Sequence, residues 1–366
     1  MSTQGKRRLS TGEAKARAQE LAFAPFAFFA ATTLRDSGVL DALARAGRDG
    51  ASSAGLAEAT GLTPQGTAAL LDFAVDLGIV EAHGEGFVLA PLGHVLLSDA
   101  TTRVNMDFTR DVARHGLPVL HASVRAGTPV GLRALGPWPT LYDGLGELDE
   151  SVATSWYRFD QFYSDQAFRD LLPHLFARPV RHLVDIGANT GRLAHACLEH
   201  DDDVHVTLVD LPGPLEQARQ QLTEAGLTAR ATLHAADLRE DDPDLPGAAD
   251  AYVMSQLLAC FSPEDIVRLL KRTAAAMAPT SRLYIVELCP DRQREPAARY
   301  SLNAISLYFI CLANGNSRFY RRDDLAGLIA RAGLHIEAEI DNLGAGHTLF
   351  CCRPSPGEHA SVGEAT

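Results

Sequence analysis

The chain lacks the features of a metal, membrane or nucleic-acid protein. It has six cysteines in 366 residues, and none of them has the spacing of metal ligands. The apolar segment 23–31 is too short to span a bilayer. The net charge of −13 disfavours nucleic acid and anionic membranes as general partners. We therefore expect no metal, no nucleic acid and no membrane partner, and a cytoplasmic protein with reduced thiols.

Cations are missing altogether from residues 51–100, which contain no lysine or arginine but six acidic residues. The same stretch has the outline of a winged helix. Thr63 caps a helix with Pro64 at its first position, and two short strands follow near 79–82 and 87–90. Phosphates would repel a recognition helix without cations. We therefore expect a structural or dimerising module here, not a DNA-binding one.

What the chain does have is a glycine turn between two apolar runs. The first run leads through Asp185 into a turn with Gly187, Asn189 and Gly191, and the second ends in Asp210, 23 residues after Gly187. Parallel-sheet proteins use such a turn to approach a nucleoside, and the second acid to bind the ribose hydroxyls. Two glycines instead of three, led by an acid, favour the cationic S-adenosylmethionine over a pyrophosphate. The alternative is a glycine turn of another doubly wound domain.

From residue 180 onward, apolar strands alternate with helices such as 263–278. We expect strands at 181–186, 204–210, 231–235, 249–254, 282–288, 334–340 and 346–352. Alternation of this kind indicates a parallel sheet covered on both faces, whereas the last two strands are close enough to pair antiparallel. The predicted fold is α/β, with a mostly parallel seven-stranded Rossmann-like sheet and an N-terminal, mainly α-helical winged-helix domain.

These motifs resemble those of the dimeric small-molecule O-methyltransferases that depend on S-adenosylmethionine, over about residues 21–353. Asp210-Leu211-Pro212 is a hallmark of that family, and Asp237 falls where the family holds the adenine. The resemblance implies a homodimer that methylates a small aromatic or polyketide-like acceptor in secondary metabolism. The cofactor residues that it implies are Asp185, Gly187, Gly191, Asp210, Leu211, Asp237, Leu238, Ser255 and Gln256.

The domain boundaries follow from the same resemblance and from composition. The expected segments are a disordered N-terminus (1–18), a winged-helix dimerisation domain (19–100), a helical substrate-lining region (101–175), a methyltransferase domain (176–353) and a disordered tail (354–366). Apolar residues within 21–43 recur with helical spacing, and we expect this face at the dimer interface.

Two segments are candidates for the acceptor pocket. The aromatic-rich stretch 155–163 precedes the cofactor domain, and its rings serve either a pocket or helix packing. The polar end of 306–318 either binds a substrate oxygen or forms a turn. The expected acceptor-lining residues are Tyr157, Phe159, Phe162, Tyr163, Tyr308, Asn314 and Asn316.

The chain departs from the family at the general base. The family places a histidine after the fourth strand, oriented by a glutamate. Aligned on Ser262, Ala259 stands at the base position and Cys260 at the next, while Asn316-Ser317 replaces the glutamate. General-base catalysis contributes typically 10²–10⁴-fold, so the loss of both groups has chemical consequences.

Three explanations remain open. An acidic phenol, an enol or an activated ring carbon reacts without a histidine, through proximity and orientation. Alternatively, another side chain supplies the base; the candidates are His115, His121, Tyr157, Asp160, Tyr163, Tyr308 and His347. Otherwise the chain binds the cofactor without transferring methyl, as a cyclase, a pericyclase or an accessory protein. A winged-helix regulator is a distant further alternative.

Overall fold

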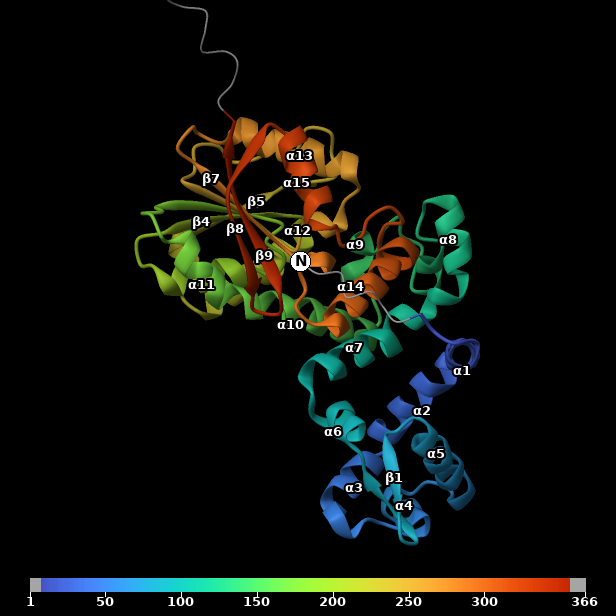
Figure 1. Ribbon diagram of the computed structural model, residues 1–366. Coiled ribbons are helices and arrows are strands. Elements are labelled where there is room, and N and C mark those ends of the chain that lie inside the picture. The colour runs from blue at the N-terminus through green and yellow to red at the C-terminus, as the bar shows by residue number, and fades with distance from the viewer. Residues whose placement is uncertain (1–7, 356–366) are drawn as a thin grey trace, which may run out of the picture. The chain divides into compact units, whose positions relative to one another are not determined.

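The computed structural model describes residues 8–355 and divides into two compact units, 1–107 and 108–366 (Figure 1). None of the described helices has the length and apolar character that crossing a bilayer requires.

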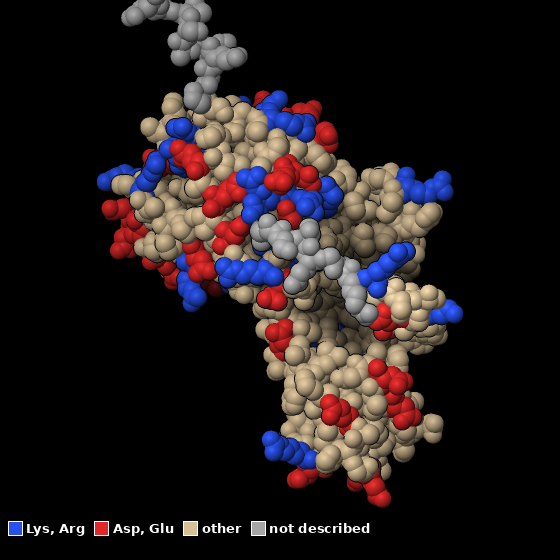
Figure 2. Space-filling model, viewed as in Figure 1, with Lys and Arg blue, Asp and Glu red and all other residues tan. Residues whose placement is uncertain are grey.

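The first unit has the predicted winged-helix order. Its elements are α1 (Thr11–Ala22), α2 (Ala24–Asp36), α3 (Val39–Ala46), α4 (Ser53–Thr60), α5 (Pro64–Asp76), β1 (Val80–His83), β2 (Gly86–Leu89) and α6 (Pro91–Ser98). The side chain of Thr63 caps α5 by accepting a hydrogen bond from the Gly66 amide. The face of this unit seen in Figure 2 is mostly uncharged.

The prediction of a disordered N-terminus is wrong for residues 11–18, which the structure describes as part of a helix. Ser10 and Glu13 form a capping box that starts α1, so the polar residues after Ser10 are helical. Residues 1–7 lie outside the described part. At the other end, Pro354 still belongs to the last strand, and 356–366 are not described.

The second unit contains the predicted seven-stranded sheet. Its strands are β3 (His182–Ile186), β4 (His205–Asp210), β5 (Ala231–Ala235), β6 (Ala251–Ser255), β7 (Arg282–Glu287), β8 (Leu334–Leu343) and β9 (His347–Pro354). Their order is β5-β4-β3-β6-β7-β9-β8. From β5 to β7 in this order, each strand runs parallel to its neighbour. Strand β9 is antiparallel to both β7 and β8. The antiparallel pairing of the last two strands is therefore confirmed.

Helices cover both faces of this sheet, because its strands are apolar on both sides. They are α10 (Glu150–Leu175), α11 (Arg192–His200) and α12 (Pro212–Glu224) on one face, and α13 (Pro263–Ala276) and α15 (Arg322–Arg331) on the other (Figure 1). Val184 packs with the second group and its neighbour Leu183 with the first. The side chain of Ser262 caps α13 by accepting a hydrogen bond from the Asp265 amide.

A third apolar cluster lies beside the sheet and is rich in aromatic residues. It joins the first half of α10 to the end of α7 (Ala100–Asp111), to α9 (Leu141–Gly144) and to α14 (Pro296–Tyr308), with α8 (Leu120–Ala126) nearby. After α14 the chain makes a single π-helical turn, Phe309–Ala313. Such turns occur frequently at functional sites.

Candidate active site

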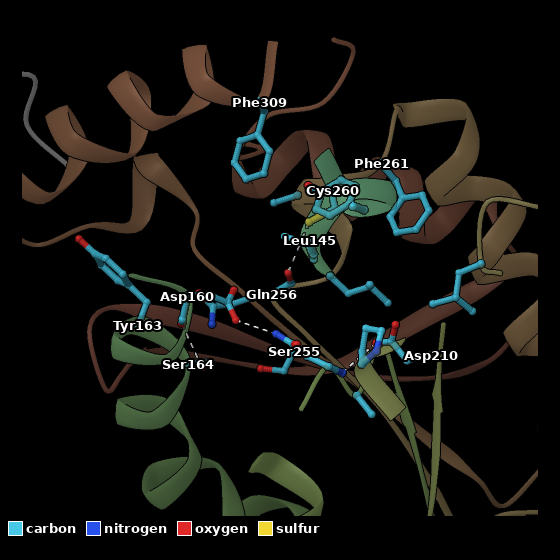
Figure 3. A pocket seen from close by; sticks show the side chains of 18 of the residues that line it. Leu145, Asp160, Tyr163, Ser164, Asp210, Ser255, Gln256, Cys260, Phe261 and Phe309 are labelled. Atoms are coloured by element: carbon cyan, nitrogen blue, oxygen red, sulfur yellow. Dashed lines mark hydrogen bonds between the residues drawn. The ribbon is translucent and has the colours of Figure 1, made fainter. Parts of the chain in front are cut away.

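A cavity of about 360 Å³ opens at the carboxyl ends of β3, β4, β5 and β6 (Figure 3). The order of the sheet reverses at β3, whose neighbours are β4 and β6. Open parallel sheets bind their ligands at such a reversal. The loops after the strands line one end of the cavity, which we call the cofactor end. Helices α10 and α14 and the segment around α9 line the other, which we call the acceptor end.

The turn after β3 needs its glycines for conformation and close packing. Gly187, Asn189 and Gly191 all have positive φ, at +78°, +47° and +78°. A Cβ on Gly187 would lie 2.5 Å from a methyl carbon of Leu257, too close for a side chain to fit without a shift. Gly191 does not line the cavity; it packs against Ala218 of α12 instead. Gly191 therefore shapes the turn but does not face the cavity, although its place in the motif predicted a cofactor contact.

Asp210 is held at the end of β4 by two backbone amides. Its carboxylate accepts hydrogen bonds from the Asn189 amide at 2.8 Å and from the Leu211 amide at 2.7 Å. At the end of β5, Asp237 accepts from the Arg239 guanidinium through both oxygens, at 2.8 and 2.7 Å, and the pairing lowers the pKa of Asp237. The two acids expected to bind the ribose and the adenine thus line one cavity.

Two buried polar atoms at the cofactor end have no hydrogen-bond partner within residues 8–355. They are Asp185 Oδ2 and Ser255 Oγ. Burial, and then the charge of Asp210, raises the pKa of Asp185 to about 7. A buried carboxylate oxygen without a partner is unfavourable unless a ligand satisfies it. The cavity therefore fits S-adenosylmethionine, which brings a cationic amino acid group and ribose hydroxyls.

The acceptor end is lined by aromatic rings. They are Phe108, Tyr142, Trp156, Phe159, Tyr163, Tyr308, Phe309 and Phe319. Phe108 and Phe159 stack with centroids 4.1 Å apart, and Trp156 Nε1 donates to Tyr308 Oη at 2.8 Å. Burial raises the pKa of Tyr308, so its hydroxyl stays protonated. This end suits a flat apolar ring with a few polar groups.

The loop after β6, where we expect the family's base, is held by a buried glutamate. Glu287 Oε1 accepts a hydrogen bond from the Leu258 amide at 2.6 Å, and Gln256 adopts a strained φ of +53°. Ala259 and Cys260 both line the cavity. Burial raises the pKa of the Cys260 thiol to about 12, so this thiol is neutral.

Comparison with known proteins decides the family. The family model of the O-methyltransferase domain matches residues 147–335, and that of the O-methyltransferase dimerisation domain matches residues 19–99. The chain belongs to the O-methyltransferase family. It is an S-adenosylmethionine-dependent methyltransferase, and S-adenosylmethionine is its cofactor.

Several curated and solved relatives resemble this methyltransferase over most of its length. Aclacinomycin 10-hydroxylase of Streptomyces purpurascens is 28% identical over 86% of this chain and 82% of its own. A 3-amino-4-hydroxybenzoate 4-O-methyltransferase of Streptomyces cremeus is 26% identical over 83% of this chain and 80% of its own. The structure of mitomycin 7-O-methyltransferase shares the fold, with a TM-score of 0.70 at 24% identity, covering 93% of this chain and 98% of that one.

Most of the expected binding residues of the methyltransferase meet in the cavity. Eight of the nine cofactor candidates line it, all but Gly191. Among the acceptor candidates Phe159, Tyr163, Tyr308, Asn314 and Asn316 line it. Tyr157 and Phe162 do not, because they lie on other faces of α10: Tyr157 contacts Gln217 at 3.5 Å, and Phe162 packs on Tyr163.

The histidine candidates for the base lie outside the cavity lining. His115 and His121 are exposed on the α7–α8 segment. His347 is fully buried in β9, and burial lowers its pKa to about 4. Of the other candidates, Asp160, Tyr163 and Tyr308 do line the cavity.

Asn314 lines the cavity, but its amide is bonded to the protein. Its Nδ2 donates to the Cys260 carbonyl at 2.5 Å. Its Oδ1 accepts from the Asn316 amide at 3.2 Å and from Ser317 Oγ at 2.9 Å. These bonds agree with the predicted alternative in which the polar end of 306–318 forms a turn and does not contact the substrate. Asn314 thus joins the end of the π-helical turn to the loop after β6.

Sequence reasoning missed the contacts between distant segments at the rim of the cavity. Arg239, besides pairing with Asp237, donates to Asp143 Oδ1 at 2.6 Å and to Thr140 Oγ1 at 3.3 Å. Nothing in the sequence pairs two residues 96 positions apart. Tyr142, between those two partners, has a buried hydroxyl without a hydrogen-bond partner in the described part of the chain.

Proposed function

We propose that this enzyme methylates an acidic phenol or enol oxygen, or an activated ring carbon, of a flat aromatic or polyketide-like acceptor. The coarser function is that of an O-methyltransferase of secondary metabolism. The observation that carries the finer proposal is the lining of the acceptor end, which presents eight aromatic rings and a buried Ala259 at the position where we expect the family's base.

Each end of the cavity has a separate task in this proposal. Asp210 binds the ribose, Asp237 the adenine, and Asp185 with Ser255 the polar groups of the amino acid part. The cofactor, when bound, supplies a methyl group on a positively charged sulfur. The aromatic rings orient the acceptor and exclude water, so that proximity contributes to the rate.

The names of relatives support an aromatic acceptor. One relative is a 2,7-dihydroxy-5-methyl-1-naphthoate 7-O-methyltransferase of Streptomyces carzinostaticus. A solved O-methyltransferase from neocarzinostatin biosynthesis, with a TM-score of 0.67 to this chain, was crystallised with 1,4-dihydroxy-2-naphthoic acid. We extend this acceptor class to the present cavity because aromatic side chains line it.

The test is a series of phenols of graded acidity. Purified enzyme, S-adenosylmethionine and catechol, 4-nitrocatechol or 1,4-dihydroxy-2-naphthoic acid are incubated, and mass spectrometry detects the gain of one methyl group. We expect the acidic phenols to react and catechol to react poorly, because an unassisted phenol with a pKa near 10 stays protonated at neutral pH. Equal rates along the series would refute the proposed preference.

A second candidate function has one specific observation in its favour. The relative from Streptomyces purpurascens is named a 10-hydroxylase, although it matches most of this chain. The fold therefore also hosts chemistry other than methyl transfer. Conversion of an acceptor to a product without an added methyl group, dependent on S-adenosylmethionine, would favour this function.

We also propose a homodimer assembled through the first unit. The dimerisation model matches residues 19–99, and Leu21, Phe23 and Phe26 are 63%, 53% and 66% exposed on α1 and α2. Exposed aromatic residues in such a group mark an interaction surface. Size-exclusion chromatography at micromolar concentration should show a dimer, and Phe26→Asp should shift it toward the monomer. A wild-type monomer would refute the proposal.

A further inference from the structure

Asp160 is a carboxylate placed where the two ends of the cavity meet. It stands on α10, in the same helical stripe as Trp156, Phe159 and Tyr163, and it lines the cavity (Figure 3). Its Oδ2 accepts a hydrogen bond from Asn189 Nδ2 at 2.8 Å, in the turn after β3. The side chain is therefore anchored on the cofactor end.

The negative charge of Asp160 also acts on groups at the acceptor end. Burial is the main cause that raises the pKa of Tyr308, Cys260 and Tyr142, and the negative charge of Asp160 adds to it in all three. These three groups lie on α14, the loop after β6 and α9. Asp160 thus lies within electrostatic range of three separate walls of the acceptor end.

Among the groups at the acceptor end, Asp160 is suited to take a proton at neutral pH. Burial raises its pKa to about 6, the charges of Asp165 and Asp210 add to that rise, and the bond from Asn189 opposes it. The other titratable groups lining the cavity are Tyr142, Tyr163, Asp185, Arg192, Asp210, Asp237, Arg239, Cys260, Asp265 and Tyr308. Tyr308 and Cys260 keep their protons, so they donate hydrogen bonds and do not act as bases.

We propose that Asp160 is the catalytic residue that receives the acceptor's proton in place of the family's histidine. This inference rests on the phenol or enol acceptor proposed above. The acceptor O–H bond breaks and its proton joins the Asp160 carboxylate. The electron pair left on oxygen forms the new bond to the methyl carbon, while the carbon–sulfur bond breaks with its electrons on sulfur. The proton passes to water after the product leaves.

This assignment also accounts for a preference for acidic acceptors. A carboxylate with a pKa of about 6 would hold the proton of a phenol with a pKa near 10 about 10⁴-fold less well than the phenoxide does. For an acceptor with a pKa near 7 the same transfer is only about tenfold unfavourable. The pKa of the acceptor therefore has to lie close to that of Asp160.

The test compares Asp160→Asn with Asp160→Glu, using the fastest phenol of the graded series. We expect Asp160→Asn to lower kcat by about 10²–10⁴-fold, and Asp160→Glu to keep more of the rate. In the wild type the rate should rise through an inflection near pH 6, whichever phenol is used, because the deprotonated carboxylate is the active form. Asp160→Asn should lose this inflection.

Asp165→Asn is the matched control. Asp165 lies on the same helix, pairs with Arg192 and does not line this cavity. Removing its charge should keep the plateau rate and move the inflection to lower pH, because that charge raises the pKa of Asp160. Calorimetry with S-adenosylhomocysteine supplies a readout independent of turnover: its Kd in Asp160→Asn should stay within about threefold of the wild type, which also verifies folding.

Two outcomes overturn the inference while the proposed function stands. One is an Asp160→Asn enzyme with wild-type rate and pH profile. The other is a loss of S-adenosylhomocysteine affinity as large as the loss of rate, because Asp160 would then position the cofactor. A wild-type enzyme that methylates no phenol of the series overturns the acceptor class, and this inference with it.

Discussion

At the cofactor end of the cavity the lining groups stand on loops that follow β3 to β6, whereas at the acceptor end they project from α10, α14 and the segment around α9. The cofactor end leaves buried polar atoms without partners, such as Asp185 Oδ2. The acceptor end is mainly aromatic ring surface, where Trp156 bonds Tyr308 and Tyr142 has one buried hydroxyl without a partner in the described residues. The cofactor end is thus prepared for a ligand with defined polar groups, and the acceptor end mainly determines the shape of the acceptor that can bind.

Asp210→Ala should have the largest effect, and this effect should fall on the cofactor end. Losing the hydrogen bonds of a charged group to the ribose costs about 1.5–3 kcal/mol, or about 10- to 150-fold in Kd for S-adenosylmethionine. Calorimetry measures this change, and Asp203→Ala in the exposed loop before β4 is the control. Asp210→Asn keeps the shape at the turn. Unchanged affinity in both Asp210 variants would remove the ribose assignment.

The pH should act on the cofactor end through Asp185. Its pKa of about 7 means that the neutral form dominates below pH 7, and a cationic ligand requires the ionised form. Affinity for S-adenosylmethionine should therefore fall about tenfold between pH 8 and pH 6. Asp185→Asn should bind more weakly and with a flatter pH dependence. A wild-type affinity that does not vary over this range would contradict the assignment.

Tyr308→Phe should affect the acceptor end alone. The substitution removes the acceptor of the Trp156 Nε1 hydrogen bond and a hydroxyl facing the cavity, at a scale of ~1 kcal/mol. We expect KM for the acceptor to rise about fivefold, with the Kd of S-adenosylhomocysteine unchanged. Tyr300→Phe, at a residue that is 71% exposed, is the control. An equal loss of cofactor affinity would show that the two ends are not separate.

Arg239→Ala should have the smallest effect but reach both ends. Arg239 bonds Asp237 at the cofactor end and Asp143 beside the acceptor-lining Tyr142. Partly exposed ion pairs contribute up to about 1 kcal/mol, so we expect both the cofactor Kd and the acceptor KM to rise about threefold. Arg272→Ala, which removes an ion pair with Asp242 outside this cavity, should change neither.

The fold could be predicted from the sequence because its signals are local. Apolar runs and turns predicted the strands and the antiparallel pairing at the end of the sheet, and the cap at Thr63 predicted α5. The start of α1 was missed because its helical signal is a capping box in a polar segment, where no apolar periodicity marks a helix.

The cofactor end could be predicted for the same reason, whereas the acceptor end could be predicted only in part. Asp185 and Asp210 follow strands directly, so short motifs place them. The acceptor end depends on which face of α10 turns inward, and this face excludes Tyr157 and Phe162 while including Trp156. The link from Arg239 to Asp143 depends on tertiary structure alone.

Asn314 has a consequence for how this site is related to that of histidine-containing enzymes. Its side chain ties the turn with Asn316 and Ser317, where we expect the family's glutamate, to the backbone of Cys260, next to Ala259. Ala259 is 2% exposed on a loop that Glu287 also holds. An imidazole at position 259 would therefore extend from this fixed loop into the cavity that Ala259 lines. Ala259→His alone would still lack an orienting carboxylate if, as we expect, Asn316 and Ser317 stand where the family has its glutamate, so a histidine base here should take more than one substitution.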